Sequence, residues 1–136
     1  MAVDCVFCKI INGEIPANKI YEDDKVLAFL DINPVNPGHT LVIPKKHSEN
    51  LIDTADEDLC AIIKAVKKIA PAIVKTVEAG GFNLGVNNGA AAGQLVNHLH
   101  FHIMPRSDND GLELWPGRPY EEGQAKQIAE KIKKEL

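Results

Sequence analysis

Residues 97–103 read Asn-His-Leu-His-Phe-His-Ile (NHLHFHI), a stretch in which every second residue is a histidine and the residues between them are large and apolar. Successive side chains of a β-strand point to opposite faces of the sheet. A strand would therefore put the three imidazoles on one face and Leu99, Phe101 and Ile103 on the other, which can enter a core. On a helix these histidines would point in different directions, so the pattern predicts a strand.

The composition is that of one ordinary globular domain. Of the 136 residues, 45% are hydrophobic and 25% are charged, and no linker-like stretch divides them, so we predict a single domain over residues 1–136. The net charge of −4 argues against nucleic acid or an acidic membrane surface as a partner, since either would require a basic stripe. No apolar run is long enough to span a bilayer, and the N-terminus lacks the pattern of a signal peptide. The three cysteines, an odd number, fit a reducing compartment, and together these features predict a cytoplasmic protein.

Hydrophobic periodicity predicts eight elements in the order α-β-β-β-α-β-β-α. The longest is a helix that follows a predicted capping box at residues 54–57 and ends at Gly80, with a kink or a local break at Pro71. The other elements are a short helix within residues 4–13, strands at residues 19–22, 25–31, 39–44 and 82–86, the histidine strand, and a final amphipathic helix at about residues 121–136. Because the long helix is separate from most strands, we predict an α+β fold: a mainly antiparallel sheet of about five strands with one long helix and short N- and C-terminal helices.

A loop of small residues, Asn87 to Gln94 (NNGAAAGQ), precedes the histidine strand. Its backbone N–H groups can approach a ligand anion closely because few side chains are in the way. Beside a row of histidines, this loop indicates a phosphate held next to an imidazole. The histidines themselves fit a metal site, because neutral imidazole is a common zinc ligand, or nucleophilic catalysis, in which one imidazole attacks and its neighbours handle charge. A polar strand face without a function is the third alternative.

Four segments carry a family resemblance. Residues 98–104 (HLHFHIM) alternate histidine with apolar residues, and residues 7–16 (FCKIINGEIP), 29–34 (FLDINP) and 38–47 (GHTLVIPKKH) occur in a fixed order around them. In sequence, order and approximate loop lengths these segments resemble the histidine triad (HIT) nucleotide-binding proteins, in particular the Hint-like branch and its bacterial members. The resemblance covers about residues 5–106. It implies a HIT-like fold and a hydrolase that forms a covalent nucleotidyl-histidine intermediate.

The resemblance also implies roles for individual residues. His100, the middle histidine, matches the nucleophile that attacks the α-phosphorus, His102 matches a partner of a phosphate oxygen, and His39 matches a further imidazole of the cluster. Asp31 matches the carboxylate that accepts the ribose hydroxyls. The other implied nucleotide-binding positions are Asn87, Gly93 and Gln94 for the phosphate and Phe7, Ile10, Ile15, Phe29 and Ile32 for the base. A neutral imidazole is a competent nucleophile at pH 7, because its reference pKa is about 6.5, so this chemistry needs no metal.

The sequence departs from the family at two places. Eukaryotic Hint proteins have a serine where Leu95 stands, and Leu95 cannot donate a proton to the leaving group. Beyond Arg106 the similarity to the branch decreases, because Trp115 comes later than the tryptophan near the C-terminus of the family and a helix follows it. This tail is more similar to the bacterial members.

Cys5 and Cys8 form a CxxC pair close to the N-terminus. Two unremarkable thiols are one interpretation, and a redox pair is disfavoured because the strand-turn-helix context of thioredoxin is absent. A zinc site needs two more ligands, and His47 and His98 are the histidines without another role. Bacterial proteins that resemble this one use such a set, and thiolates with imidazoles favour zinc over hard cations. We therefore predict a structural zinc ion at Cys5, Cys8, His47 and His98, with His100 left free for catalysis.

The leading hypothesis for function is cleavage of nucleoside 5′-phosphoramidates or related nucleotidyl conjugates, with a purine nucleotide of the AMP or GMP type as substrate or product. A dinucleoside polyphosphate hydrolase and a non-catalytic nucleotide-binding scaffold are the alternatives. A nucleotidyltransferase is disfavoured because that branch has glutamine in place of His102, and a zinc hydrolase because no carboxylate ligand accompanies the histidines. The resemblance also implies a homodimer. In support, the apolar residues of the long helix, among them Ile63, Ile69 and Val74, cover more of its circumference than one sheet face can bury.

Overall fold

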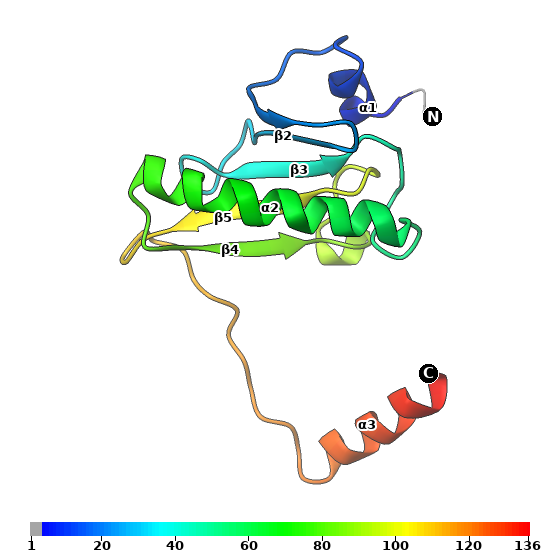
Figure 1. Ribbon diagram of the computed structural model, residues 1–136. Helices are drawn as coiled ribbons and strands as arrows, with labels where there is room; N and C mark the ends of the chain where they lie inside the picture. The colour runs from blue at the N-terminus through cyan, green and yellow to red at the C-terminus, as the bar shows by residue number, and fades with distance from the viewer. Residues whose placement is uncertain (1–3) are drawn as a thin grey trace.

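The computed structural model describes residues 4–136, which form a five-stranded antiparallel sheet with helices (Figure 1). The elements in chain order are α1 (Val6–Ile11), β1 (Lys19–Glu22), β2 (Val26–Leu30), β3 (Thr40–Pro44), α2 (Asp56–Val77), β4 (Gly81–Val86), the 3-10 helix η1 (Ala90–Ala92), β5 (Phe101–Arg106) and α3 (Gln124–Glu135). The strand order is β1-β2-β3-β5-β4, and each neighbouring pair is antiparallel. The predicted α+β fold is therefore confirmed.

Both faces of the sheet are covered, which explains why its central strands are apolar at consecutive positions. Neighbouring residues of a strand point to opposite faces. In β2, Val26 and Ala28 belong to the core beneath α2, whereas Leu27 and Phe29 belong to the core beneath α1. All four residues are buried. The short helix α1 is thereby fixed against the sheet face opposite to α2.

The long helix α2 differs from its sequence prediction at its start and in its middle. Ala55 is the N-cap residue and makes no side-chain hydrogen bond to the first turn, so the predicted capping box is wrong. The Thr54 hydroxyl instead donates to the Asn50 carbonyl oxygen at 2.6 Å and lies 2.6 Å from the Ser48 hydroxyl, which holds the preceding loop together. The helix continues through Pro71, an exposed residue, so the predicted break is absent. Packing of α2 on the sheet outweighs the one hydrogen bond that a proline removes.

The histidine segment is a regular strand only in its second half. β5 begins one residue before His102, so His98 and His100 lie in the irregular segment that precedes it. In that segment the Leu99 N–H donates to the Ser48 carbonyl oxygen at 2.8 Å, outside the ladder between β3 and β5. The predicted alternation still holds, since the apolar residues between the histidines all lie in the core beneath α2.

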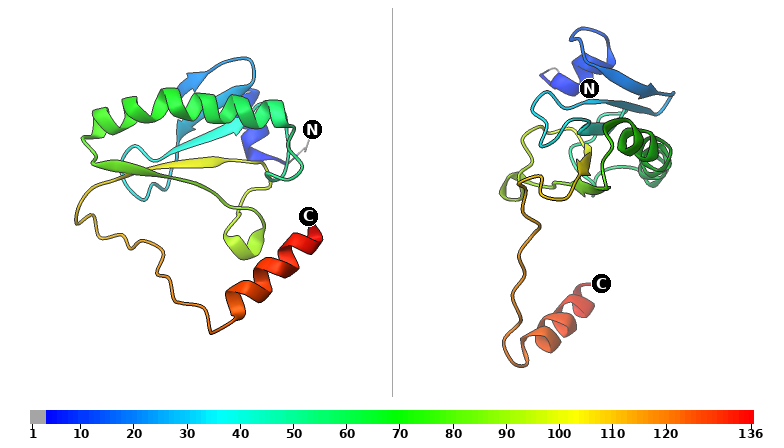
Figure 2. Two further views of the ribbon diagram at one scale, coloured as in Figure 1. Left: turned by 60° about the horizontal axis from the view of Figure 1, so that its bottom comes forward. Right: turned by 90° about the vertical axis from the view of Figure 1, so that its left-hand side faces the viewer.

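Residues 107–136, the C-terminal arm, leave the body of the molecule after β5. Figure 1 shows an extended stretch that runs past the edge strand β4 and ends in α3, and Figure 2 shows from two further directions that α3 stands apart from the sheet. The base of the arm is anchored, because Arg106 Nε donates to Asp110 Oδ2 at 2.7 Å. The helix predicted at residues 121–136 is present as α3. Neither α3 nor any other helix of residues 4–136 is long and apolar enough to cross a membrane.

Candidate active site and metal site

A backbone carbonyl determines which nitrogen of His100 carries the proton. His100 Nδ1 lies 2.7 Å from the carbonyl oxygen of His98. Since a carbonyl oxygen can only accept a hydrogen bond, Nδ1 carries the proton, and Nε2 of the neutral ring keeps a lone pair. The ring is buried and packs edge-to-face with the ring of Phe7, with the ring centroids 5.1 Å apart. His100 is therefore held in the tautomer that a nucleophile acting through Nε2 requires.

A chain of hydrogen bonds fixes the tautomers of His39 and His102. The backbone N–H of Val35 donates to His39 Nδ1 at 3.1 Å, so the neutral ring carries its proton on Nε2. That Nε2 lies 2.9 Å from His102 Nδ1, which must accept, and the His102 proton is therefore on Nε2. His102 Nε2 is buried and has no hydrogen-bond partner within residues 4–136. Because a buried N–H without a partner costs free energy, this atom is a donor in place for a ligand oxygen.

Burial keeps both of these imidazoles neutral near pH 7. It lowers the pKa of His39 below its ordinary value, although the Asp31 carboxylate acts in the opposite direction. For His102, burial and the neighbouring imidazoles of His100 and His39 lower the pKa to about 4. The hydrogen-bond chain therefore consists of uncharged rings in the tautomers assigned above.

The predicted ribose carboxylate and one predicted base-binding residue, Phe7, contact these imidazoles. Asp31 Oδ2 is 3.6 Å from His39 Nε2, and Asp31 Oδ1 accepts the Asn33 N–H at 2.8 Å. The base-binding residues differ in exposure: Phe7, Ile10 and Phe29 are buried, Ile15 packs against them, and Ile32 is 88% exposed. The structure therefore provides an apolar wall supported by the core, and Ile32 is the member of the set that stands in solvent.

Loop 87–94 has a defined, hydrogen-bonded conformation. The buried side chain of Gln94 accepts the Gly89 N–H at 2.9 Å and donates to the Glu49 carbonyl oxygen. Gly89 and Gly93 have φ values of 92° and 93°, which glycine adopts without the strain that other residues incur. The glycines thus serve the backbone conformation of the loop, and Gln94 ties the loop to the segment that follows β3.

Two backbone donors predicted to contact a phosphate already have partners in this loop. The N–H groups of Gly93 and Gln94 both donate to carbonyl oxygens within the loop. The Asn87 amide makes only a long contact of 3.5 Å with the Gly93 carbonyl oxygen. The Leu95 N–H, one residue further along, has no hydrogen-bond partner within the described residues. The donors that remain for an anion therefore include the Asn87 amide and the Leu95 N–H, and the N–H groups of Ala90 and Ala91 likewise make no hydrogen bond within the described residues. The sequence analysis did not single out Leu95, because a backbone group leaves no residue signature.

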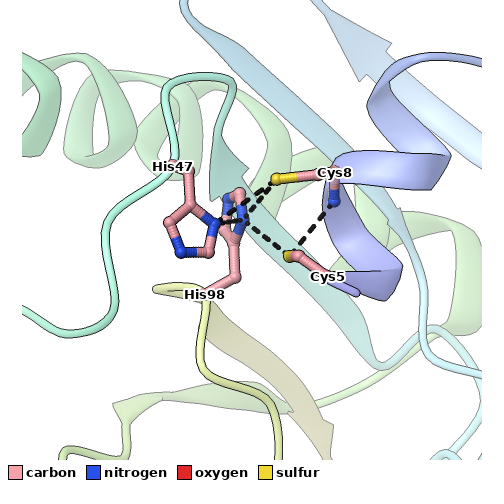
Figure 3. A group of neighbouring side chains, drawn as sticks. All are labelled: Cys5, Cys8, His47 and His98. Carbon is pink, nitrogen blue, oxygen red and sulfur yellow. Dashed lines mark hydrogen bonds between the residues drawn. The ribbon is translucent and has the colours of Figure 1, made fainter. Parts of the chain in front are cut away.

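The predicted zinc ligands form a second cluster, drawn in Figure 3. Cys5 and Cys8 come from the start of α1, His47 follows β3, and His98 precedes β5. His98 Nδ1 lies 3.3 Å from Cys5 Sγ, 3.6 Å from Cys8 Sγ and 3.1 Å from His47 Nδ1. Cys8 Sγ lies 3.4 Å from His47 Nδ1. The fold thus brings together four ligand atoms from three separate segments.

The geometry of this cluster fits a tetrahedral zinc ion. With Zn–S bonds of about 2.3 Å and Zn–N bonds of about 2.0–2.1 Å, a regular tetrahedron places S and N roughly 3.6 Å apart and two N atoms roughly 3.3 Å apart. The separations in the cluster are within about 0.3 Å of these values. His98 Nε2 lies 2.8 Å from the Pro44 carbonyl oxygen, so Nε2 carries the proton and Nδ1 presents its lone pair to the cluster, as in most metal-bound histidines. Burial lowers the pKa of His98 to about 4, which keeps the ring neutral.

The group formed by Asp31, His39 and His102 is also compact enough for a cation, but its hydrogen bonds do not fit one. A metal ion there would take the lone pairs of His39 Nε2 and His102 Nδ1. The Val35 N–H bond to His39 Nδ1 requires the proton to be on Nε2. Of the two groups, the cysteine-histidine group is therefore the one whose hydrogen bonds leave lone pairs free for a metal ion.

Comparison with known proteins identifies the family. The family model described as the HIT domain matches residues 12–109, and the chain belongs to the HIT family. An uncharacterized HIT-like protein of Methanocaldococcus jannaschii is 59% identical over 107 residues, which are 79% of this chain and 82% of that protein. An adenosine 5′-monophosphoramidase of Candida albicans is 41% identical over 138 residues, 97% of this chain and 91% of the relative. An adenylylsulfatase of Arabidopsis thaliana is 52% identical over 109 residues, 80% of this chain and 55% of the relative. The class defined by the family and these relatives is a HIT-family nucleotide hydrolase.

Solved structures agree with this assignment. A HIT family protein from Bacillus subtilis has a TM-score of 0.89 and 47% sequence identity, covering 98% of this chain and 97% of its own. A histidine triad family protein from Mycobacterium smegmatis, described as zinc-bound, has a TM-score of 0.77 and 38% identity, covering 98% of both chains. The HIT-like fold is therefore confirmed.

Proposed function

We propose that this chain hydrolyses nucleoside 5′-phosphoramidates or related nucleotidyl conjugates at the α-phosphorus through a covalent nucleotidyl-His100 intermediate. The observation that supports this most directly is the pair of fixed tautomers: His100 presents a lone pair at Nε2, and His102, whose ring centroid is 5.0 Å away, presents an N–H at Nε2. One nitrogen is suited to attack phosphorus, and the other is suited to donate to a phosphoryl oxygen.

In the first step, the His100 Nε2 lone pair forms a bond to the α-phosphorus while the bond from phosphorus to the leaving nitrogen breaks. The positive charge that develops on the ring is stabilised at Nδ1–H by the His98 carbonyl oxygen. His102 Nε2–H donates to a phosphoryl oxygen, where negative charge accumulates. The leaving nitrogen takes a proton from solvent, because the exposed Leu95 side chain cannot provide one.

In the second step, water attacks the α-phosphorus and breaks its bond to His100 Nε2, which regains its lone pair. The products of the two steps are an amine and a purine nucleoside monophosphate. Asp31 is suited to accept hydrogen bonds from the ribose hydroxyls, and its carboxylate is oriented by the Asn33 N–H. The Asn87 amide and the Leu95 N–H are suited to hold the phosphate, and the apolar wall that ends at Ile32 is suited to the base.

The Cys5, Cys8, His47 and His98 cluster is proposed to bind a structural zinc ion. When bound, the ion would cross-link α1 to the segments that follow β3 and precede β5. His98 would be a ligand through Nδ1, and its carbonyl oxygen accepts the hydrogen bond from His100 Nδ1. The chain's own residues would thus perform the chemistry, and a bound ion would fix the segment that carries the nucleophile. Elemental analysis of protein purified without chelators should give one zinc ion per chain, and its absence would contradict the assignment.

A symmetric homodimer is also proposed. The sequence pointed to the apolar surface of α2 as its interface, whereas the structure points mainly to the edge strand β4. The sheet of the same chain buries most of the apolar side of α2, including Ile69 and Ile73, which leaves Ile63 47% exposed. Phe82 and Leu84 of β4 are 42% and 41% exposed, and β4 is an edge strand. An apolar free edge favours pairing with a second copy across a two-fold axis. Light scattering at micromolar concentration should give the mass of a dimer.

Adduct trapping tests the catalytic proposal. The protein is mixed with adenosine 5′-phosphoramidate, quenched at alkaline pH to preserve the P–N bond, digested, and analysed by mass spectrometry for an adenylyl group on the His100 peptide. We expect the adduct on His100 and turnover of phosphoramidates faster than turnover of diadenosine polyphosphates. Faster cleavage of the polyphosphates would favour the alternative hydrolase, and nucleotide binding without turnover would favour the scaffold.

A further inference from the structure

The C-terminal arm has no packing partner within its own protomer. Every residue from 111 to 136 is exposed, and α3 buries none. Large apolar side chains nevertheless recur along the arm: Leu112, Leu114, Trp115, Tyr120, Ile128, Ile132 and Leu136. Monomeric soluble proteins rarely leave so many apolar side chains of one segment in water. The arm is therefore suited to contact another surface.

The sequence of α3 shows which of its sides makes this contact. A stripe of apolar residues follows helical spacing on one side, formed by Ala125, Ile128, Ala129, Ile132 and Leu136. Glu130 and Lys134 lie on the other side. A single helix of this length is only marginally stable in water by itself, so the apolar stripe of α3 requires a partner surface.

The body of the molecule offers an apolar groove of about 470 Å³ between α2 and the β1–β2 hairpin. Ile69 and Ile73 of α2 are its buried floor, and Ile20 and Ala72 are exposed at its rim. The α3 helix of the same protomer does not fill it. The arm leaves past β4 (Figure 1), whereas the groove is lined by Ile20 and Tyr21 of β1, which is at the opposite edge of the sheet.

A second copy at the free edge of β4 would bring an identical groove to the arm. With a two-fold axis perpendicular to the sheet, β4 of one protomer would lie beside β4 of its partner. The two sheets would then form one continuous sheet, with β1 of each protomer at an outer edge and both α2 helices on the same face. The extended residues 107–123 can span up to roughly 55 Å. This exceeds the six strand spacings of about 4.8 Å that separate the end of β5 from β1 of a second copy paired at the edge of β4. In Figure 2, α3 turns toward the side of the sheet that carries α2. That is the side on which the groove opens.

We propose that α3 of each protomer docks in the groove between α2 and the β1–β2 hairpin of a second copy, so that the dimer exchanges its two C-terminal arms. This inference rests on the proposed homodimer. The similarity to the Bacillus subtilis structure covers 98% of this chain at a TM-score of 0.89, so the superposed region includes most of the arm. Within its own protomer, however, residues 111–136 of the arm pack against no other element. A second copy is the partner surface that every molecule of this protein has available.

Disulfide cross-linking between different chains tests the exchange. In a Cys60→Ser background, which removes the exposed native thiol, Ile132→Cys and Ala72→Cys are made in separate chains. The two proteins are mixed, allowed to exchange subunits, oxidised mildly, and separated on a denaturing gel without reductant. Lys134→Cys, on the other side of α3, replaces Ile132→Cys in the matched control. We expect a band of twice the chain mass from the mixture of Ile132→Cys and Ala72→Cys, and at most one tenth of that yield from the control.

Each other outcome overturns the exchange in a recognisable way. A dimer by light scattering that gives no cross-link would refute the docked arm while leaving the proposed dimer intact, and a monomer would refute both. A chain that carries both substitutions and forms only an internal disulfide would show that α3 folds back on its own body. Binding of the wild-type protein to anionic vesicles, lost in Ile132→Glu and without any cross-link, would assign α3 to a lipid surface instead.

Discussion

His98 and His100 are separated by one residue, yet they belong to two groups of histidines with different chemistry. His98 keeps its proton on Nε2 for the Pro44 carbonyl oxygen, and its Nδ1 lone pair faces two thiols and His47. His100 keeps its proton on Nδ1 for the His98 carbonyl oxygen, and its Nε2 lone pair is free. The side-chain chemistry is identical in both, so the neighbouring backbone oxygens decide which residue is suited to be a ligand and which a nucleophile.

The largest expected effect separates the two groups by activity. His100→Ala removes the only nitrogen proposed to bond to phosphorus, so phosphoramidate turnover should fall by several orders of magnitude. Binding of a nucleoside monophosphate, measured by calorimetry, should persist, because Asp31, His102 and the Leu95 N–H remain. Zinc content should also be unchanged, since the ligands are untouched. Turnover close to that of the wild type would exclude the covalent mechanism for this chain.

The next effect separates the groups by stability. Cys8→Ser removes a proposed metal ligand from a buried cluster and should lower the free energy of unfolding by at least about 2 kcal/mol, or Tm by roughly 5–10 °C. The zinc content should drop in parallel, while the folded fraction should still form the adduct on His100. Cys60→Ser is the matched control, because Cys60 is exposed on α2 and should change neither quantity. Equal stability of the two variants would argue that the cluster holds no metal.

Within the catalytic group, His102 should matter less than His100. His102→Ala deletes a donor to the phosphoryl oxygen worth about 3 kcal/mol in the transition state, which corresponds to roughly a 100-fold loss of kcat. His102→Gln keeps an N–H donor and should recover part of this loss. If kcat of His102→Ala fell as far as kcat of His100→Ala, His102 would have a further role besides stabilising charge on the phosphoryl oxygen.

The smallest effect is a change in the pH dependence of stability. The pKa of folded His102 is lowered to about 4, whereas an unfolded histidine titrates near 6.5. Between these values the unfolded state binds the proton and the folded state does not, so stability falls as the pH decreases from about 6.5 toward 4. In His102→Gln the slope of unfolding free energy against pH should decrease by up to about 1.4 kcal/mol per pH unit in that window. An unchanged slope would show that His102 titrates normally in the folded protein.

Side-chain patterns in the sequence predict the fold and the two histidine groups well. The alternation around His100 correctly placed the intervening apolar residues in the core, and the CxxC pair led to the cluster with His47 and His98. The failures concern backbone hydrogen bonds. The hydroxyl of Thr54 could cap α2 or bind the preceding loop, and it does the second.

The tautomers of the site were out of reach of sequence reasoning for the same reason. They depend on the Val35 N–H and on the carbonyl oxygens of Pro44 and His98, which are backbone atoms that any residue type would supply. Only the folded chain shows which nitrogen each of them faces. The exposure of the apolar residues on α2 was likewise overestimated, because the width of the sheet beneath the helix cannot be read from helical periodicity.

The tautomers themselves are therefore the most direct test of the division between the two groups. Long-range 1H–15N correlation NMR of the zinc-loaded protein at pH 7 distinguishes a protonated, an unprotonated and a metal-bound ring nitrogen for each histidine. We expect His100 to carry its proton on Nδ1, and His39, His98 and His102 to carry theirs on Nε2, with Nδ1 of His98 bound to the metal. A His100 ring protonated on Nε2, or a metal-bound nitrogen on His100, would contradict the account.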